Sequence, residues 1–360
     1  MKKVKALSYQ VEIGDISESG LSKILGGAKY KNAGIFILVD ENTLQHCLPK
    51  LIATHPSLKD AEVIEIESGE QHKNIEVTAN IWRVLAELNA TRSSLIINLG
   101  GGVITDMGGF IASTFKRGID FINIPTTLLS QVDASIGGKT GVDLDGLKNL
   151  IGVINNPQAV YVDTDFLRTL PRNEIISGFG EIIKHGLIQD KTYWEVIKAI
   201  DYKSVADYAQ LVYKSIDIKN EIVLDDPTEK NVRKLLNFGH SVGHAIETYS
   251  LESEFTSLLH GEAIAIGMIC ESYISYKKRL LKKEELDEIV NFILPIYPKF
   301  VMNEVTYNRI LEIMKNDKKN RGKEYNFTLL KGIGNGVYDK TAAANEIIDS
   351  LNFYQNLING

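Results

Sequence analysis

The sequence changes from a strand pattern to a helix pattern at Asn98-Leu99-Gly100-Gly101-Gly102-Val103-Ile104-Thr105-Asp106. Glycines at such a turn let the backbone approach a ligand closely, and the helix N-terminus offers free N–H groups to a pyrophosphate. The run departs from the dinucleotide-binding pattern G-x-G-x-x-G because Thr105 stands where the third glycine would fall. It predicts either a dinucleotide-binding turn or only a tight connection between a strand and a helix.

Short β-branched apolar runs alternate with helical periods on both sides of this turn, up to about residue 170. The expected strands cover residues 34–39, 61–66, 94–99, 121–124 and 159–163. This alternation is typical of βαβ units, which build a mostly parallel sheet. We therefore expect an α/β domain over residues 1–170.

Beyond Pro171 the strand pattern nearly disappears and helical periodicity takes over. We expect helices over 174–188, 207–223, 232–249 and 262–276, with one short strand at 326–330. A chain of 360 residues is long enough for two cores, since single cores rarely grow past roughly 250 to 300 residues. The second domain is expected to be all-α and to cover residues 171–360.

Composition excludes several classes of protein. The net charge of -6 disfavours a general nucleic-acid binder, which usually carries a basic face. The two cysteines, Cys47 and Cys270, cannot build a disulfide framework or a four-cysteine zinc site. We find no apolar run of signal-peptide or membrane-span length. A cytoplasmic protein without a nucleic-acid or membrane partner is expected.

A second glycine-rich run, Gly137-Gly138-Lys139-Thr140-Gly141, ends like a phosphate-binding P-loop. That loop needs a further glycine five residues before Gly138, where Asp133 stands, so a nucleoside triphosphatase is disfavoured. Lys148 and Asn149 follow, and Pro125-Thr126-Thr127 precedes. Lysines close to an acid suit an anionic substrate, although a solvated polar connection is the alternative.

Histidines concentrate in the helical half of the sequence. His240 and His244 are spaced i, i+4 and share one face of a helix, and His260 opens the next helix. Glu181 on another helix could add a carboxylate. Three protein ligands with one open position is how catalytic zinc is held, but helical histidines also pack or form hydrogen bonds. The zinc-protease pattern H-E-x-x-H is absent because Ser241 replaces its glutamate.

Taken together, these motifs closely resemble the 3-dehydroquinate synthase family, within the wider group of metal-dependent glycerol-dehydrogenase-like proteins. The resemblance runs from about residue 35 to 330, in order and with compatible spacing. It is carried by Gly101 to Asp106, Arg117, Pro125-Thr126-Thr127, Asp133, Gly137 to Thr140, Lys148-Asn149, Glu181 to Lys184, Arg233 to His244 and His260-Gly261-Glu262. Departures are Thr105 in place of glycine and the variant acidic stretch Asp226-Pro227-Thr228.

The resemblance implies a metal site and an NAD site. The metal ligands correspond to Glu181, His240 and His260, usually holding Zn²⁺, with Co²⁺ as the other candidate, whereas His244 corresponds to a residue that contacts substrate and helps to move protons. The implied NAD contacts are Asp40, Asn42, Glu70, Lys73, Gly101, Gly102, Val103, Asp106, Thr126, Thr127, Lys139, Lys148, Phe166 and Thr169.

The resemblance also implies a substrate site and a reaction. The substrate contacts correspond to Arg117, Asp133, Lys139, Asn149, Lys184, Lys219, Arg233, Asn237 and Lys318, and Glu229 corresponds to a carboxylate that acts with His244. The family converts 3-deoxy-D-arabino-heptulosonate 7-phosphate into 3-dehydroquinate and phosphate, in the shikimate pathway to aromatic amino acids. NAD is needed but not consumed, and a homodimer is expected.

Three other functions are weighed against this one. A sister sugar-phosphate cyclase would use the same metal and NAD, but Arg233 and Asn237 match the carboxylate contacts of the dehydroquinate branch. A glycerol-type metal-dependent dehydrogenase would leave the lysines around Gly138 and after Asn316 without an anionic ligand. A non-catalytic metal- or nucleotide-binding module would not need the full set of acids, bases and cations.

Overall fold

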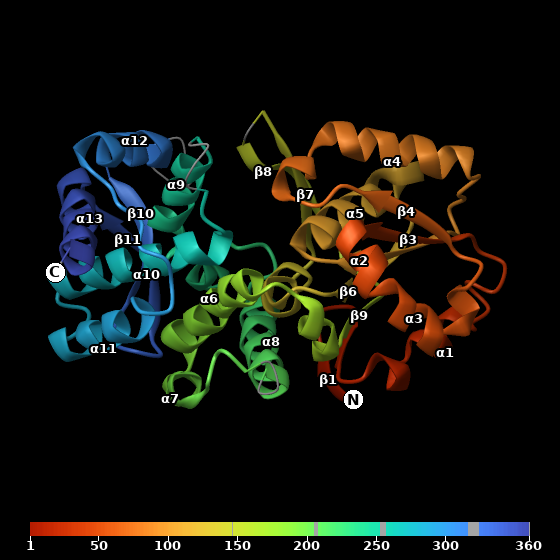
Figure 1. Cartoon of the computed structure of the whole chain (residues 1–360), viewed down its shortest axis with the longest axis horizontal. Helices are drawn as coiled ribbons and strands as arrows, with labels where there is room; N and C mark the ends of the chain where they lie inside the picture. The colour runs from red at the N-terminus through yellow and green to blue at the C-terminus, as the bar shows by residue number, and fades with distance from the viewer. Residues whose placement is uncertain (146, 205–207, 253–256, 316–323, 360) are drawn as a thin grey trace. The chain divides into compact units, whose positions relative to one another are not determined.

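The computed structural model describes residues 1–359 apart from 146, 205–207, 253–256 and 316–323. The chain forms two compact units (Figure 1). The first consists of Met1–Pro171 and Tyr208–Asn220, and the second of Arg172–Asp207 and Glu221–Gly360. Helix α8 (Tyr208–Asp225) therefore contributes to both units, a feature that helical periodicity alone does not reveal. The assignment of NAD binding to residues 1–170 and of metal and substrate binding to 171–360 stays a prediction.

A seven-stranded sheet forms the centre of the first unit. Its order is β1 (Lys2–Lys5), β2 (Gln10–Ile13), β9 (Ala159–Val162), β6 (Asp120–Pro125), β5 (Leu95–Gly100), β3 (Ile35–Asp40) and β4 (Glu62–Ile66). β1 and β2 are antiparallel, and the other neighbouring pairs are parallel. The five predicted strands are confirmed, and with them the mostly parallel α/β sheet. The four-residue strands β1 and β2 were not foreseen, since both are short and contain charged or polar residues.

Helices cover both faces of this sheet. Ile37 of β3 belongs to a core cluster with Leu48 and Leu51 of α3 (Leu48–Thr54), whereas the adjacent Phe36 belongs to a second cluster with Ile81 of α4 (Ile75–Glu87) and Phe110 of α5 (Gly102–Thr114). Successive side chains of a strand point to opposite faces, so a strand buried on both faces is continuously apolar. Two short helices, α1 (Leu21–Leu25) and α2 (Glu41–His46), complete the first face.

The second glycine-rich run forms a hairpin of its own, β7 (Lys139–Leu144) and β8 (Leu147–Ile154). Val142 of β7 joins the core cluster that contains Phe110 of α5. The sequence predicts a loop here, either one that binds an anionic substrate or a solvated polar connection. The structure differs because the residues of β7 that face α5 are small or apolar, while much of β8 is exposed.

The second unit is predominantly helical. It contains α6 (Arg172–Gln189), α7 (Lys191–Ala199), α9 (His240–Leu251), α10 (His260–Lys277), α11 (Lys283–Ile293), α12 (Glu304–Lys315) and α13 (Ala344–Asn359), with the antiparallel pair β10 (Tyr325–Leu330) and β11 (Gly336–Ala342). α10 contacts α6, α9, α11 and α13 and is buried nearly all round, as its continuous apolar sequence requires. The expected strand at 326–330 is confirmed, but its partner β11 was not foreseen because its sequence is largely polar.

The continuous helix expected over 232–249 is wrong. A short 3-10 turn covers Val232–Asn237, and α9 begins only at His240. Gly239 between them has φ 79, a left-handed conformation that glycine adopts readily and that interrupts a helix. A Cβ at this position would also lie 2.6 Å from Cγ of Met268 on α10. His240 is thereby placed in the first turn of a helix.

Within the described residues, none of the helices combines the length and the apolar character needed to span a membrane.

A carboxylate from α10 closes the first turn of α9. Gly239, at the N-cap position, has no side chain that could accept from the first turn of N–H groups. The fully buried Glu271 accepts instead from the N–H of Gly239 at 2.6 Å and from the N–H of Val242 at 3.1 Å. The segment that carries His240 is therefore fixed to α10 by charged hydrogen bonds.

We expect Glu271→Gln to lower the free energy of unfolding by about 1–3 kcal/mol, since the amide has one acceptor oxygen for two buried donors. Urea unfolding of the two proteins measures the difference. The matched control is Glu284→Gln, which alters an exposed glutamate in the first turn of α11 and should change stability by less than about 0.5 kcal/mol. Equal effects of the two substitutions would contradict the capping role of Glu271.

Candidate functional site

The glycine turn of the first unit connects β5 directly to α5. β5 ends at Gly100, and α5 begins at Gly102, so Val103 lies in its first turn. A Cβ at Gly101 would lie 2.9 Å from Cγ2 of Thr127, so this position accommodates only glycine without movement of the neighbouring loop. Thr105, the departure from the family pattern, is buried and donates its hydroxyl to the carbonyl of Gly101 at 3.2 Å. The turn thus accepts threonine at this position.

The predicted NAD contacts lie largely along one edge of the sheet. Asp40 ends β3, Gly101 follows β5, Thr126 follows β6, and the 3-10 turn Thr164–Thr169 follows β9. These strands are parallel, so their carboxyl ends meet at the same edge, which is where open α/β sheets bind ligands. Asn42 lies exposed in α2, just beyond Asp40.

Three predicted NAD contacts already have structural roles at this edge. Asp40 caps α2 by accepting from the N–H of Thr43 at 2.8 Å. Phe166 is buried in the core cluster that contains Ile37, so its ring packs inward, and Thr169 donates to the carbonyl of Phe166 at 3.4 Å.

Gln131 joins two loops of this edge and was not singled out from the sequence. Its fully buried amide nitrogen donates to the carbonyl of Pro125 at 3.2 Å and to the carbonyl of Asp163 at 2.9 Å. Pro125 precedes Thr126 and Asp163 precedes the Thr164–Thr169 turn. The sequence gives no signal for this role, because the two carbonyls that Gln131 contacts follow strands that are distant from each other in the sequence.

A charged group of predicted NAD contacts surrounds Lys73. The buried Nζ of Lys73 lies 2.7 Å from Oδ2 of Asp106 and 3.9 Å from Oε1 of Glu70, and Nζ of Lys148 lies 3.9 Å from that same glutamate oxygen. Burial alone would lower the pKa of Lys73, but the carboxylates of Asp106 and Glu70 outweigh it and raise the pKa above its usual value. Lys73 is therefore held as a cation.

The predicted substrate residues of the first unit are less closely gathered. Nζ of Lys219 on α8 lies 2.6 Å from Oδ1 of Asp133. Lys139 is exposed at the start of β7, and it pairs with Ile154, so the hairpin register does not place it opposite Asn149. Arg117 follows the C-terminal end of α5 and precedes β6, so the structure places it at the opposite edge of the sheet from Gly101.

In the second unit, three helices bring a carboxylate and two imidazoles together. Glu181 on α6 is fully buried. Its Oε1 lies 3.6 Å from Nε2 of His240 on α9 and 3.7 Å from Nε2 of His260 on α10. Its other oxygen contacts the buried Nζ of Lys184, one turn further along α6. The structure thus brings together the three residues predicted to bind metal.

The opposite ring nitrogens of the two histidines also have acceptors. Nδ1 of His240 lies 3.0 Å from the carbonyl oxygen of Phe238, and Nδ1 of His260 lies 3.3 Å from Oε2 of Glu247. Burial and the nearby charge of Lys184 hold the pKa of His240 well below its usual value. Burial would also lower the pKa of His260, but the carboxylates of Glu247 and Glu181 outweigh it and raise the pKa to about 10.

His244 completes a group of three imidazoles. Its ring centroid lies 4.9 Å from that of His240 and 5.6 Å from that of His260. One ring nitrogen from each of the three lies within 4.8 Å of the other two. Proximity alone therefore allows His244 either as a ligand or as a neighbour of the site, and its exposure is compatible with contact to a substrate.

The remaining predicted residues of the second unit lie on the turn before α9. Nδ2 of Asn237 donates to Oε1 of Glu229 at 2.7 Å, and Nη1 of the buried Arg233 donates to the carbonyl of Pro227 at 2.7 Å. The carboxylate of Asp226 accepts from the backbone N–H groups of Lys230, Asn231 and Arg233. Asp226 thus organises this variant acidic stretch. Lys318 lies outside the described residues.

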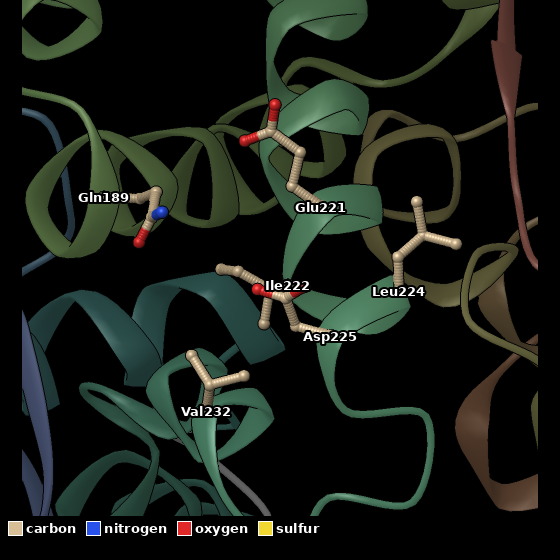
Figure 2. A pocket seen from close by; sticks show the side chains of 6 residues that line it. All are labelled: Gln189, Glu221, Ile222, Leu224, Asp225 and Val232. Atoms are coloured by element: carbon tan, nitrogen blue, oxygen red, sulfur yellow. The ribbon is translucent and has the colours of Figure 1, made fainter.

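A cavity of about 290 Å³ in the second unit has none of these predicted residues in its described lining (Figure 2). Its described lining consists of Gln189, Glu221, Ile222, Leu224, Asp225 and Val232. Figure 2 shows the carboxylates of Glu221 and Asp225 carried by the same helix, α8. Two carboxylates and no lining cation disfavour an anionic ligand, so this cavity is not the candidate site.

Comparison with known proteins points to one family over most of the chain. The family models described as 3-dehydroquinate synthase N-terminal and 3-dehydroquinate synthase C-terminal match residues 63–177 and 178–320. A 3-dehydroquinate synthase from Parabacteroides distasonis is 42% identical over 341 residues, which cover 94% of this chain and 95% of the relative.

Two solved structures of other synthases have the same fold. A 2-deoxy-scyllo-inosose synthase complexed with carbaglucose-6-phosphate, NAD⁺ and Co²⁺ has a TM-score of 0.84 and 22% identity over 99% of both chains. A 2-epi-5-epi-valiolone synthase from Streptomyces hygroscopicus with NAD⁺ and Zn²⁺ bound has a TM-score of 0.81 and 25% identity, also over 99% of both chains.

Breaking the Lys73–Asp106 pair should destabilise the protein. Asp106→Asn leaves a buried ammonium without its closest carboxylate, so we expect a loss of about 3 kcal/mol in the free energy of unfolding. The double variant Lys73→Met/Asp106→Asn should recover part of this loss, which urea unfolding measures. Asp287→Asn breaks an exposed i, i+4 pair with Lys283 and should cost less than about 0.5 kcal/mol. A loss in the double variant equal to that of Asp106→Asn would contradict the argument.

Proposed function

This chain belongs to the 3-dehydroquinate synthase family, and we propose that it performs the family's reaction with a divalent metal ion held by Glu181, His240 and His260. The enzyme converts 3-deoxy-D-arabino-heptulosonate 7-phosphate into 3-dehydroquinate and inorganic phosphate, a step of aromatic amino-acid biosynthesis. It is a carbon–oxygen lyase that uses NAD without consuming it. The observation that carries the proposal is the convergence of one carboxylate and two imidazoles from three helices.

The spacing of these ligand atoms fits a divalent ion. Ligands about 2.1 Å from a tetrahedral zinc ion lie roughly 3.4 Å from one another. Nε2 of His240 and Nε2 of His260 lie 3.6 and 3.7 Å from Oε1 of Glu181, close to that value. Two imidazoles and one carboxylate form a donor set typical of catalytic zinc, with a fourth position for substrate. Zn²⁺ and Co²⁺ are both present in the solved relatives.

The metal and NAD would supply chemistry that side chains cannot provide. A bound divalent ion is a Lewis acid that stabilises negative charge on a substrate oxygen, and NAD accepts a hydride and later returns it. The protein's own residues orient the substrate and neutralise its charges. Lys184, one turn from Glu181, is fully buried and held in place by that carboxylate.

The predicted cations suit a substrate that carries both a carboxylate and a phosphate. In the second unit these are Lys184 and Arg233, and in the first unit Lys139 and Lys219. The guanidinium of Arg233 is held by the carbonyl of Pro227, so it can present a planar pair of N–H groups to an oxyanion with little loss of side-chain entropy. Lys219 is oriented in the same way by Asp133.

We assign proton transfer to His244, with Glu229 in support. His244 is exposed beside the buried imidazole of His240 and the partly buried imidazole of His260, so it can reach both a substrate and solvent. Glu229 is tied to Asn237, a predicted substrate contact. A general acid or base must lie within hydrogen-bond reach of the proton that it moves.

NAD binding is assigned to the carboxyl edge of the first unit's sheet. Gly101 and Gly102 let the pyrophosphate approach the free N–H groups of α5, while Thr126 and Thr127 border the same turn. The proposal rests on this topology together with the resemblance. Cytoplasmic location and a homodimer stay predictions from the sequence.

A sister sugar-phosphate cyclase is the second candidate, because both synthases described above share the fold and bind NAD⁺ and a divalent metal ion, and one of them binds carbaglucose-6-phosphate. Arg233 and Asn237 favour the dehydroquinate branch. The identity of 42% to a 3-dehydroquinate synthase, against 22% and 25% to the cyclases, supports this preference.

Purified protein with Zn²⁺ and a trace of NAD⁺ should release inorganic phosphate and form 3-dehydroquinate from the heptulosonate phosphate in equal amounts. Many turnovers per NAD⁺ are expected because the cofactor is regenerated in each cycle. A phosphate assay and chromatography of the product measure both. Phosphate release without dehydroquinate would move the assignment to a sister cyclase, and accumulation of NADH in proportion to product would contradict both readings.

His260→Ala should lower kcat by more than about 1,000-fold, since two remaining ligands hold a divalent ion poorly. NAD⁺ affinity should change by less than about threefold, because the predicted contacts for NAD lie in the first unit. Steady-state assays and cofactor titration measure these effects. His46→Ala, an exposed histidine of α2, is the control and should retain both metal and activity. Activity that survives metal depletion would refute the proposed site.

A further inference from the structure

A buried carboxylate beside the proposed metal site has no assigned role in the reaction. Glu247 lies on α9, two turns after His240, and its side chain is 4% exposed. Its Oε2 lies 3.3 Å from Nδ1 of His260 on α10. An ionised carboxylate in such a place costs several kcal/mol of desolvation. The contact with His260 explains why the cost is tolerated.

The two ring nitrogens of His260 face two different carboxylates. Nε2 lies 3.7 Å from Oε1 of Glu181, and Nδ1 lies 3.3 Å from Glu247. A neutral imidazole carries its proton on one nitrogen and offers the other as a ligand. When the ring binds a metal ion it must be neutral, and an acceptor at Nδ1 then keeps the remaining proton there, so that Nε2 offers its lone pair toward Glu181 and His240.

The backbone of His260 is placed by other residues. The N–H of Leu259 donates to Glu262 at 2.8 Å, and the N–H of Gly261 donates to Oγ of Ser177 at 3.0 Å. The residues before and after His260 are thus held by hydrogen bonds that do not involve Glu247. The contact of Glu247 with Nδ1 bears instead on the orientation of the imidazole ring and on the choice of its protonated nitrogen.

His240 offers an internal comparison. Its Nδ1 lies 3.0 Å from a neutral backbone carbonyl, that of Phe238, whereas His260 has a charged acceptor. A carboxylate makes the imidazole a stronger electron donor than a carbonyl does, and such partners of metal ligands typically change metal affinity 10- to 100-fold.

We propose that Glu247 is a positioning residue that holds the Nδ1–H tautomer of His260 and strengthens its Nε2 as a ligand for the divalent ion. This inference rests on the proposed function, because it needs the ion bound by Glu181, His240 and His260. Glu247 acts through His260 and contacts neither the ion nor the substrate.

The test measures the affinity of the metal-free protein for Co²⁺ alone, by competition with a chromophoric chelator at one fixed pH. Glu247→Gln keeps the shape and an acceptor oxygen but removes the charge, and we expect about 10-fold weaker binding. Glu247→Ala also frees the ring, and we expect about 100-fold weaker binding. The loss of Co²⁺ affinity in Glu247→Gln measures the effect of the charge, and the further loss in Glu247→Ala measures the effect of the ring orientation.

A control variant separates this role from a general effect on folding. Glu12→Gln alters another buried glutamate, in the first unit, that accepts from Lys3 and from the N–H of Gly20. It should lower the free energy of unfolding but leave Co²⁺ affinity within twofold of wild type. A merely structural Glu247 would behave like Glu12, with lost stability and unchanged Co²⁺ affinity.

Two results would overturn the inference in distinguishable ways. Co²⁺ affinity within twofold of wild type for both Glu247→Gln and Glu247→Ala would refute the positioning role while the metal site stands. Absence of stoichiometric Co²⁺ binding by the wild type, or equally tight binding by His260→Ala, would refute the proposed metal site and the inference with it.

Discussion

The second unit depends on the burial of one carboxylate, that of Glu181, among groups that compensate its charge. Lys184 contacts it along α6, and two imidazoles approach it from α9 and α10. A buried anion without such partners would be strongly unfavourable. The three helices must therefore pack closely enough at this point for their side chains to compensate the charge of Glu181. Glycine stands beside each of the three residues: Gly180, Gly239 and Gly261. A Cβ at Gly261 would overlap the carbonyl of Ser177 on α6, and one at Gly180 would lie 3.1 Å from the carbonyl of Gly261. Small residues thus allow the close approach that the polar cluster needs.

The first unit differs from the second because its proposed site depends on backbone groups that stay available to a ligand. Its strands are apolar on both faces, and helices cover both faces of the sheet. The loops and helix N-termini with backbone groups available to a ligand therefore lie at the carboxyl edge. Gln131 and Asp40 stabilise that edge by satisfying carbonyl and N–H groups of the loops. A side chain at Gly101 would collide with Thr127, so this position requires glycine. The backbone of the turn is therefore not covered by a side chain of its own. The carboxyl edge is therefore set by sheet topology, whereas the cluster around Glu181 and the packing of its three helices depend on each other.

The sequence predicted those features that depend on local pattern. The β-branched runs at 34–39 and 94–99 predict buried strands because they are apolar throughout and too short for a typical helix. The break before His240 escaped prediction because Leu235 and Leu236 continue the apolar period, and only the tight contact of Gly239 with Met268 requires the turn. β7 and β11 escaped because their stability comes from partners distant in sequence. Motif order predicted the convergence of Glu181, His240 and His260, but Glu247 could not be found from spacing, since its partner belongs to another helix.

The charges of the cluster explain why it suits both a metal ion and an anionic substrate. Glu181 and Glu247 carry two negative charges, and Lys184 carries one positive charge. The carboxylates of Glu247 and Glu181 raise the pKa of His260 to about 10, whereas burial and the charge of Lys184 lower the pKa of His240. A divalent ion bound by Nε2 of the two histidines would bring positive charge into a buried place. The field of that charge would act on the substrate with little screening by water. A divalent ion held beside the ammonium of Lys184 would therefore offset the two carboxylates and favour an anionic substrate next to it.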